Sequence, residues 1–409
     1  MKYESLNKIY YKNPEQHSEI YKARFNSPTT RHFDFSIKQF GRRKNYPAFL
    51  CYTEELVLFM EKIYNKQAKF SRLTEQVPQL LMRQFELMSV VDEVKSTSDI
   101  EGVHSTRQEL KEIVEGEKNS PHFSSIIKKY ITLTSNEILS FKNCDDVRKF
   151  YDEFAHQEII LNEPNKKLDG KIFRKGSVDV QTGTGKILHR GVYPEEKIIE
   201  LMTKALEILN DEKIPALIRI AAFHYFFEYI HPFYDGNGRT ARFIASYYLA
   251  EHLNYLTALR LSVIIKRQRK KYYDLFEETD SEFNCGDLTP FVYGFISIVA
   301  DTFDDIENNL NRKTKQLIKY REKILDLVRG DELTLKIYDI LLQSTLFFGQ
   351  GVSMEEFIKL TNKSRNTIKS RIETIPKGHI IRTGSKKYFY KLNMKIFYDG
   401  DNFKKYVVI

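Results

Sequence analysis

The chain of 409 residues contains no tryptophan, only three cysteines and no long apolar run. Cys51, Cys144 and Cys285 lie far apart, and none of them forms the close pairs that are typical of zinc ligands or disulfide frameworks. We therefore expect a protein of a reducing compartment and assign it to the cytoplasm. The first residues lack the apolar core of a secretory signal and no stretch resembles a membrane span, so no membrane partner is expected.

Positive charge is unevenly distributed along the chain. The net charge is +9. Positions 311–409 hold 21 Lys and Arg against 10 Asp and Glu, an excess of 11 positive charges. The first 310 residues therefore carry a net charge of −2, which is 9 minus 11. The basic character belongs to the C-terminal part, and this asymmetry indicates a nucleic-acid contact there.

The most informative stretch is HPFYDGNGRTAR, which runs from His231 to Arg242. Apolar residues recur at helical spacing on both sides of it, over 214–230 and 243–253. The stretch should therefore join the end of one buried helix to the start of the next. Its two glycines allow successive N–H groups to turn inward as an anion-binding nest, at the positive end of the second helix.

The side chains of this stretch suit phosphate chemistry. The helix dipole alone contributes about 0.3–1 kcal/mol, so polyphosphate binding needs more. Arg239 and Arg242 are three residues apart in the first helical turn, share a face and can fork onto phosphate oxygens. Asp235 can hold Mg²⁺, which prefers carboxylate and phosphate oxygens. His231, with an ordinary pKa of about 6.5, can take a proton from a hydroxyl near neutral pH.

This stretch resembles the signature of the Fic family, His-x-Phe-x-(Asp/Glu)-Gly-Asn-Gly-Arg-x-x-Arg, and matches it at every specified position. Chance agreement at eight such positions in a chain of this length is about one in ten million, from average residue usage. The resemblance covers roughly residues 87–304. It implies an all-α core with a small β-hairpin flap, and transfer of AMP from ATP to a Ser, Thr or Tyr hydroxyl of a protein target.

The resemblance also implies roles for single residues. His231 is the catalytic base, and Asp235 holds Mg²⁺ on the α- and β-phosphates. Tyr272 and Tyr273 follow a basic run at a place comparable to that in many Fic chains. They would line the nucleotide pocket, although structural packing is an equal alternative. The remaining nucleotide contacts come from the signature itself: Phe233, Gly236, Asn237, Gly238, Arg239 and Arg242.

A second motif, STSDIEG, lies upstream of the signature. Its Thr97 and Glu101 are four residues apart and share one face of a predicted helix. The motif resembles the inhibitory helix of Fic proteins that carry this element ahead of the catalytic core. By that resemblance Glu101 would bridge Arg242, obstruct the γ-phosphate and keep transfer low. The same carboxylate could also orient a water that removes AMP from a target. The alternative is a glutamate on a solvated helix face.

Between the STSDIEG motif and the signature, the alternation of apolar and polar residues over 170–180 and 187–193 predicts a β-hairpin. In Fic proteins a hairpin at this place is the flap, which holds the target backbone by strand addition. The alternative is a surface hairpin without a role. Helical patterns predict most of the rest of the chain: 54–66, 78–91, 107–115, 123–139, 145–162, 196–210, 266–278, 287–311 and 311–329.

We therefore predict a mainly α protein with four parts. Residues 1–86 form an N-terminal arm, irregular to about residue 50, followed by helices. Residues 87–310 form the Fic catalytic domain with its inhibitory helix, and 311–330 form a linker helix. Residues 331–409, with three short helices and a basic hairpin, resemble a winged helix-turn-helix domain. The third helix carries residues of the types that contact phosphates and base edges in DNA: Arg365, Asn366, Lys369 and Arg371.

Two other functions stay open from the sequence. One alternative is a Fic enzyme with another donor, such as UTP, GTP or a phosphocholine conjugate, because the signature binds phosphates rather than bases. A DNA-binding regulator with a vestigial nucleotide site is disfavoured by the intact signature. The C-terminal part can contact DNA or protein with equal expectation, and a homodimer is a further option for this chain.

Overall fold

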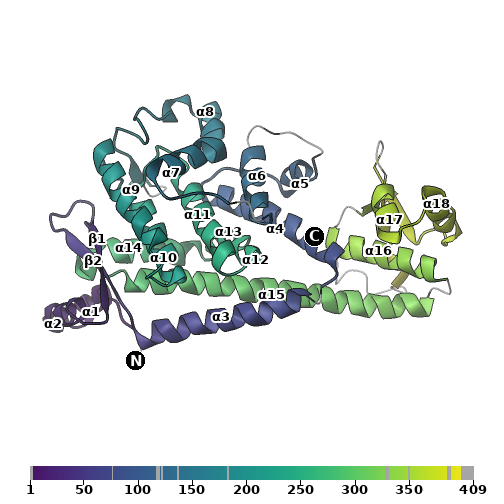
Figure 1. Ribbon diagram of the computed structural model, residues 1–409, viewed down its shortest axis with the longest axis horizontal. Helices are drawn as coiled ribbons and strands as arrows, with labels where there is room; N and C mark the ends of the chain where they lie inside the picture. Colours follow the sequence, from purple (N-terminus) through teal and green to yellow (C-terminus); the bar gives the residue numbers. More distant parts are fainter. Residues whose placement is uncertain are drawn as a thin grey trace. The chain divides into compact units, whose positions relative to one another are not determined.

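The computed structural model describes residues 3–75, 77–116, 120, 123–135, 138–181, 184–327, 331–348, 351–384 and 388–397. The protein is mainly helical, as predicted, with a few short strands (Figure 1). It divides into two compact units. Unit 1 comprises Met1–Ser71 and Glu86–Ile306, and unit 2 comprises Arg72–Phe85 and Glu307–Ile409. Within the described ranges, no helix is both long enough and apolar enough to cross a membrane.

Most of residues 3–51 form helices and strands, so the expectation of an irregular arm is wrong. Two helices, α1 (Leu6–Lys12) and α2 (Pro14–Phe25), precede an antiparallel pair of strands, β1 (Thr30–Ile37) and β2 (Tyr46–Cys51). Buried and exposed side chains alternate along the second half of β1. This two-residue period was present in the sequence, but its short length hid it among the surrounding tyrosines and lysines.

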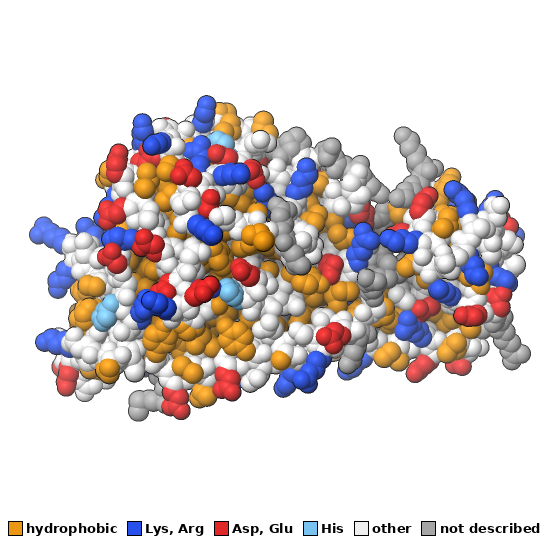
Figure 2. Space-filling model, in the orientation of Figure 1, with side chains coloured by type: hydrophobic (Ala, Val, Ile, Leu, Met, Phe, Trp, Pro, Cys, Tyr) orange, Lys and Arg blue, Asp and Glu red, His pale blue; other side chains and the backbone are white. Residues whose placement is uncertain are grey.

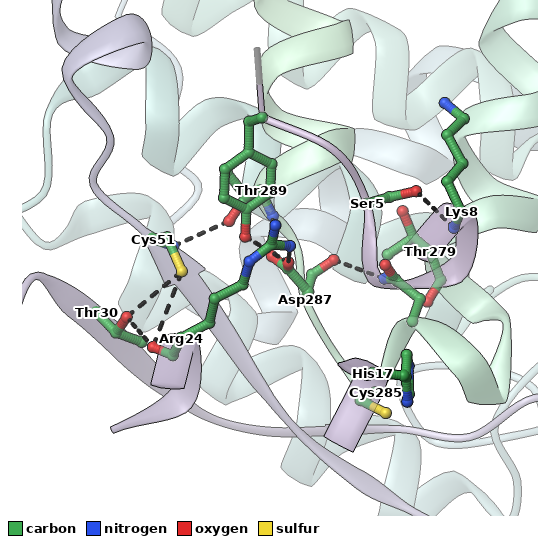
Figure 3. A network of polar contacts seen from close by, with 12 residues as sticks. Ser5, Lys8, His17, Arg24, Thr30, Cys51, Thr279, Cys285, Asp287 and Thr289 are labelled. Carbon is green, nitrogen blue, oxygen red and sulfur yellow. Dashed lines mark hydrogen bonds and ion pairs between the residues drawn. The ribbon is translucent and has the colours of Figure 1, made fainter. Parts of the chain in front are cut away.

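A buried polar network joins this N-terminal part to the rest of unit 1 (Figure 3). Its centre is Asp287, whose Oδ2 accepts a hydrogen bond of 2.6 Å from the Tyr3 hydroxyl and lies 3.5 Å from Arg24 Nη1. Thr289 donates its N–H to Asp287 Oδ1 and accepts the Cys51 N–H on its hydroxyl. Because these buried polar groups satisfy one another, the N-terminal elements belong to the same packed body as the site helices.

The helices before the flap are α3 (Glu54–Glu75), α4 (Gln79–Ile100), α5 (Arg107–Val114), α6 (Ser124–Thr132), α7 (Cys144–Tyr151) and α8 (Gln157–Asn162). A π-helical turn at Asp152–His156 joins α7 to α8. Figure 1 shows α3 alongside the long helix α15 (Thr289–Leu327), and the Phe59 ring stacks on the Tyr293 ring at 5.0 Å. Helix α15 continues through residue 311, where two separate helices were expected, because no proline or glycine interrupts residues 295–327.

The predicted β-hairpin is present but shorter than expected. Strand β3 (Asp179–Gln181) pairs antiparallel with β4 (Ile187–Arg190), and residues 182 and 183 of the expected turn lie outside the described residues. Residues 171–173 do not extend the hairpin, because their three N–H groups donate to the Glu195 carboxylate at 2.7–2.9 Å. The Glu195 carboxylate therefore accepts the hydrogen bonds that a neighbouring strand would have accepted from residues 171–173 in the predicted hairpin.

The centre of unit 1 is α10 (Ala216–Ile230), which packs against α9 (Glu195–Asn210) and α11 (Asn237–His252). Nearly every side chain of α10 is buried, so it forms the core of the unit. Short helices α12 (Tyr255–Ala258) and α13 (Leu261–Arg267) follow, then α14 (Arg269–Asp280). The helix expected over 266–278 is thus divided at Gln268 between α13 and α14.

Unit 2 contains α16 (Glu332–Phe348), α17 (Met354–Thr361) and α18 (Arg365–Thr374), with a sheet of strand order β5-β7-β6. The antiparallel strands are β5 (Val352–Ser353), β6 (Ile380–Thr383) and β7 (Phe389–Leu392). Ser353 and Ser364 cap α17 and α18 with their side chains. Strand β5 was not predicted, because two residues carry no periodicity. Residues 385–387 of the predicted hairpin turn lie outside the described residues.

Candidate active site

The signature stretch connects α10 to α11, as its flanking periodicities predicted. His231 follows α10 in the left-handed conformation, with φ 53°, and Gly236, with φ 78°, precedes α11. The Asn237 side chain closes the turn: its Oδ1 accepts the Phe233 N–H at 2.9 Å and its Nδ2 donates to the Phe233 carbonyl at 2.8 Å. Asn237 was predicted to bind nucleotide, but its side chain is buried and occupied in shaping the turn.

A cavity of about 540 Å³ opens over this turn. It is lined by residues of the turn after α4, the flap, α10, the signature turn, α11 and α14. Gly238 lies so close to Glu101 that a side chain at this position would collide with the carboxylate. The signature and inhibitory-motif residues that line the cavity are Glu101, His231, Asp235, Gly236, Asn237, Gly238 and Arg242, and α14 adds Tyr272 and Tyr273.

His231 is held in the form of a base. Its Nδ1 lies 3.2 Å from the Glu228 backbone carbonyl. Because a carbonyl can only accept a hydrogen bond, Nδ1 carries the proton and Nε2 keeps its lone pair. Burial, aided by the nearby His189, lowers the pKa of His231 to about 4. The imidazole is therefore neutral at pH 7 and can accept a proton.

Arg242 is bound to the inhibitory motif. Its Nη2 lies 2.6 Å from Glu101 Oε1, and its Nε donates to the Thr97 hydroxyl at 3.0 Å. The guanidinium is 1% exposed and the Glu101 side chain 27% exposed. Burial opposes ionisation of Glu101, but the Arg242 charge and hydrogen bond outweigh it and lower the pKa of this carboxyl. The helical spacing of Thr97 and Glu101 thus brings both residues to one guanidinium.

Two signature residues that were predicted to bind nucleotide lie away from the cavity. Arg239 is 1% exposed, and its Nη1 lies 2.9 Å from Glu158 Oε2 in a buried ion pair. Side chains three positions apart point about 60° apart around a helix axis, so Arg239 and Arg242 face different neighbours. Phe233 is buried and stacks on the Tyr151 ring at 3.6 Å. In this conformation Arg242 lines the cavity, whereas Arg239 does not and is paired with Glu158.

Asp235 and the tyrosine pair do face the cavity. Within the described part of the chain, no three His, Cys, Asp or Glu side chains gather into a metal site. One carboxylate at the cavity nevertheless suits Mg²⁺, which is commonly bound by one or two carboxylates together with substrate phosphates. Tyr272 is buried and its hydroxyl lies 2.7 Å from His224 Nε2, whereas Tyr273 is 41% exposed.

Comparison with known proteins relates this region to a known family. A model of the Fic/DOC family matches residues 151–249, which contain the flap, α9, α10 and the signature turn. The chain contains a Fic domain. Its fold is similar to that of a crystal structure of a Fic family protein from Desulfovibrio desulfuricans G20, with a TM-score of 0.51 and 19% identity, covering 83% of this chain and 96% of that one.

Curated relatives match over shorter segments. The chain is 29% identical over 164 residues to "Protein adenylyltransferase fic-1" of Caenorhabditis elegans, which covers 38% of this chain and 29% of that protein. It is 36% identical over 107 residues to "Protein adenylyltransferase Fic" of Drosophila erecta, which covers 25% of this chain and 20% of that protein. The chain thus spans less than a third of the length of these relatives.

Arg174 is a residue of this Fic site that the sequence did not reveal. It is completely buried, and its Nε and Nη2 donate to the His231 carbonyl at 2.9 and 2.7 Å. Its Nη2 also lies 3.3 Å from the Ile230 carbonyl. Arg174 therefore caps the C-terminal end of α10 and fixes the backbone of His231. Glu195, through its bonds to the N–H groups of 171–173, holds the segment that carries Arg174.

We expect Arg174→Lys to lower the free energy of unfolding by about 1–3 kcal/mol. A lysine ammonium cannot make the several hydrogen bonds that the planar guanidinium donates, so buried backbone carbonyls are left unpaired. Urea unfolding followed by circular dichroism measures the change. Arg190→Lys is the matched control, since Arg190 pairs with Asp179 on the exposed flap and should contribute little. Equal losses in the two variants would contradict a special role for Arg174.

Proposed function

We propose that this protein transfers AMP from ATP to a hydroxyl side chain of a protein target. The observation that carries the proposal is one cavity in which a neutral His231 faces the N-terminal end of α11, with Arg242 on its wall. A base and an anion-binding helix end are the two groups that nucleotidyl transfer to a hydroxyl requires. The names of the two relatives, both protein adenylyltransferases, support the same activity.

In the proposed reaction, His231 Nε2 takes the proton of a Ser, Thr or Tyr hydroxyl while its oxygen attacks the α-phosphorus. The bond from the α-phosphorus to the bridging oxygen breaks, and pyrophosphate leaves. The N–H groups of Gly236, Asn237 and Gly238 stabilise negative charge on phosphate oxygens. Arg242, once released from Glu101, binds the outer phosphates. Catalysis is thus mainly positioning and electrostatic stabilisation.

Asp235 is the residue that would hold Mg²⁺ beside the α- and β-phosphates, where the ion would neutralise phosphate charge. We assign Tyr273 to the wall of the nucleotide pocket, because its half-exposed ring borders the cavity. Arg239 and Phe233 act indirectly: the ion pair with Glu158 and the stack on Tyr151 fix the turn from the far side. Strand β4 of the flap borders the same cavity, where a target strand could add to it.

Glu101 is proposed as the inhibitory residue of this reaction. While the Glu101 carboxylate is bound to Arg242, that arginine is not available to the γ-phosphate of ATP. The carboxylate also fills the space beside Gly238, so ATP cannot adopt the productive position. We further propose that the same carboxylate orients a water that hydrolyses the bond between AMP and a modified target. The protein would then add or remove AMP according to the position of Glu101.

The test uses ATP labelled at the α-phosphate, with magnesium, and follows self-labelling and labelling of a cell lysate on one gel. The parent and the Glu101→Gly variant are compared. Label that appears with Glu101→Gly supports AMP transfer. Label that appears only with UTP or GTP would show a Fic enzyme with another donor. Absence of label with every donor would overturn the proposed activity.

Unit 2 carries an observation that favours a second, nucleic-acid-binding role. Its helices and three-stranded sheet follow the order expected of a winged helix, which we propose it to be. On α18, Ile368 is buried whereas Arg365, Asn366 and Lys369 are exposed. Arg371 instead lies 2.5 Å from Asp331 in an ion pair. In Figure 2, Lys and Arg side chains are visible over the α17–α18 region, interspersed with Asp and Glu.

We expect the full-length double variant Arg365→Glu, Lys369→Glu to lose affinity for duplex DNA in a gel shift. Each phosphate contact that is lost should reduce the slope of log affinity against log salt by about 1. The control is Lys395→Glu, outside α18. An unchanged slope would assign the exposed face of α18 to a protein partner instead.

A further inference from the structure

Glu228 is an acidic residue of the cavity that the proposed reaction has not yet used. It lies one helical turn before His231 on α10, and its Oε2 is 3.7 Å from His231 Nδ1. Its side chain is 14% exposed, and its Oε1 is buried and has no hydrogen-bond partner among the described residues. A buried carboxyl oxygen without a partner is costly, so its retention beside a base calls for an explanation.

The surroundings of Glu228 set when it is charged. Burial, and then the charge of Glu101, raise the pKa of Glu228 to about 8, against the opposing charge of Arg242. Glu228 is therefore mostly neutral at pH 7 and becomes a carboxylate as the pH rises. The titratable and charged groups that line the cavity together with it are Glu101, Lys166, Asp179, Lys186, His189, Tyr229, His231, Tyr234, Asp235, Arg242, Tyr272, Tyr273, Glu277 and Asp280.

The backbone carbonyl of Glu228 already fixes the His231 tautomer, because it accepts the Nδ1–H at 3.2 Å. The side chain must therefore contribute in another way. When His231 takes the proton of the target hydroxyl, its ring becomes a cation in a site that strongly disfavours one, as its depressed pKa shows. A carboxylate at 3.7 Å favours that cation electrostatically, and more so because burial weakens screening.

We propose that Glu228 is a positioning residue of the transfer reaction, whose carboxylate stabilises the His231 imidazolium that forms as the target hydroxyl loses its proton. This inference rests on the proposed AMP transfer. Glu228 exchanges no proton with the substrate: the proton passes from the hydroxyl oxygen to His231 Nε2. The new bond joins that oxygen to the α-phosphorus while pyrophosphate departs.

The pH dependence of the rate follows from this assignment. Below its pKa, Glu228 is neutral and gives the imidazolium little support; above it, the carboxylate is present and the rate should rise. In the Glu101→Gly background the rise should come at lower pH, because the repelling charge of Glu101 is gone and Arg242 still favours ionisation. Glu228→Gln is neutral at all pH values, so its rate should stay at the low plateau.

The kinetic experiment compares Glu101→Gly with Glu101→Gly, Glu228→Gln across this pH range. We expect a kcat lower by about 10- to 100-fold at the upper plateau, with a nearly unchanged KM for ATP. Glu228→Asp should retain the pH-dependent rise with a smaller amplitude. Glu207→Gln, on the exposed surface of α9, is the control for the substitution itself. A merely structural role would change the rate equally at every pH.

A second readout needs no activity. The ring nitrogen signals of His231 in the nitrogen-15 spectrum, assigned with His231→Ala, should show an inflection at the pKa of Glu228. Glu228→Gln should abolish the inflection, and Glu101→Gly should move it to lower pH. A missing inflection, or transfer whose pH profile survives Glu228→Gln, would overturn this inference alone. Failure of Glu101→Gly to transfer from any nucleotide would instead overturn the proposed function.

Discussion

His231→Ala is expected to reduce AMP transfer by about 100- to 10,000-fold, the usual contribution of a general base. The imidazole lines the cavity, and Nε2 keeps the lone pair because Nδ1 donates to the Glu228 carbonyl. Binding of ATP should be nearly unchanged, because the helix end and Arg242 remain. Transfer of α-phosphate label in the Glu101→Gly background measures the rate, and isothermal titration measures the binding.

Two features make this expectation specific. Because burial lowers the pKa of His231 to about 4, the ring stays neutral down to acidic pH, so protonation of His231 itself should reduce the rate only near that value, well below the pH range in which Glu228 titrates. His104→Ala is the matched control, since the His104 side chain is 89% exposed and far along the chain from the signature. A His231→Ala variant that transfers AMP as fast as the His104→Ala variant would remove the proposed base from the mechanism.

The signature turn could be predicted from the sequence because its determinants are local. Helical periodicity on both sides of residues 231–242 located the two helix ends, and the glycines marked the turn between them. The same logic failed where side-chain direction depends on packing. Arg239 and Arg242 share a spacing that suggests one common ligand, yet Glu158 pairs with the first and Glu101 with the second.

Residues whose side chains hydrogen-bond to distant backbone groups could not be predicted from sequence patterns. Arg174 and Glu195 bind carbonyl and N–H groups of distant segments, and a backbone partner imposes no residue type that a pattern could reveal. Glu228 was also missed, because a glutamate three positions before a histidine is an ordinary helical spacing. The N-terminal strands and the continuity of α15 were missed for a different reason: the two-residue period of β1 is short, and the absence of proline and glycine from residues 295–327 was not weighed as a sign of one continuous helix.

Glu101→Gly is expected to raise AMP transfer strongly. Loss of the carboxylate frees Arg242 Nη2 from its 2.6 Å contact and opens the space beside Gly238. A charge-assisted hydrogen bond contributes about 1.5–3 kcal/mol, so its removal as a competitor should increase transfer by about 10- to 100-fold. Label transferred from ATP to protein measures the change. Removal of AMP from a labelled target, by the same variant, should be lost.

Graded variants separate the charge of Glu101 from its bulk. Glu101→Gln keeps the shape but weakens the attraction to Arg242, so it should transfer AMP at a rate between those of the parent and Glu101→Gly. Thr97→Val removes only the hydroxyl that accepts from Arg242 Nε at 3.0 Å and should raise transfer slightly. If Glu101→Gln stays as slow as the parent, inhibition is steric. If Glu101→Gly transfers no faster than the parent, the ion pair is a structural contact and the motif is not inhibitory.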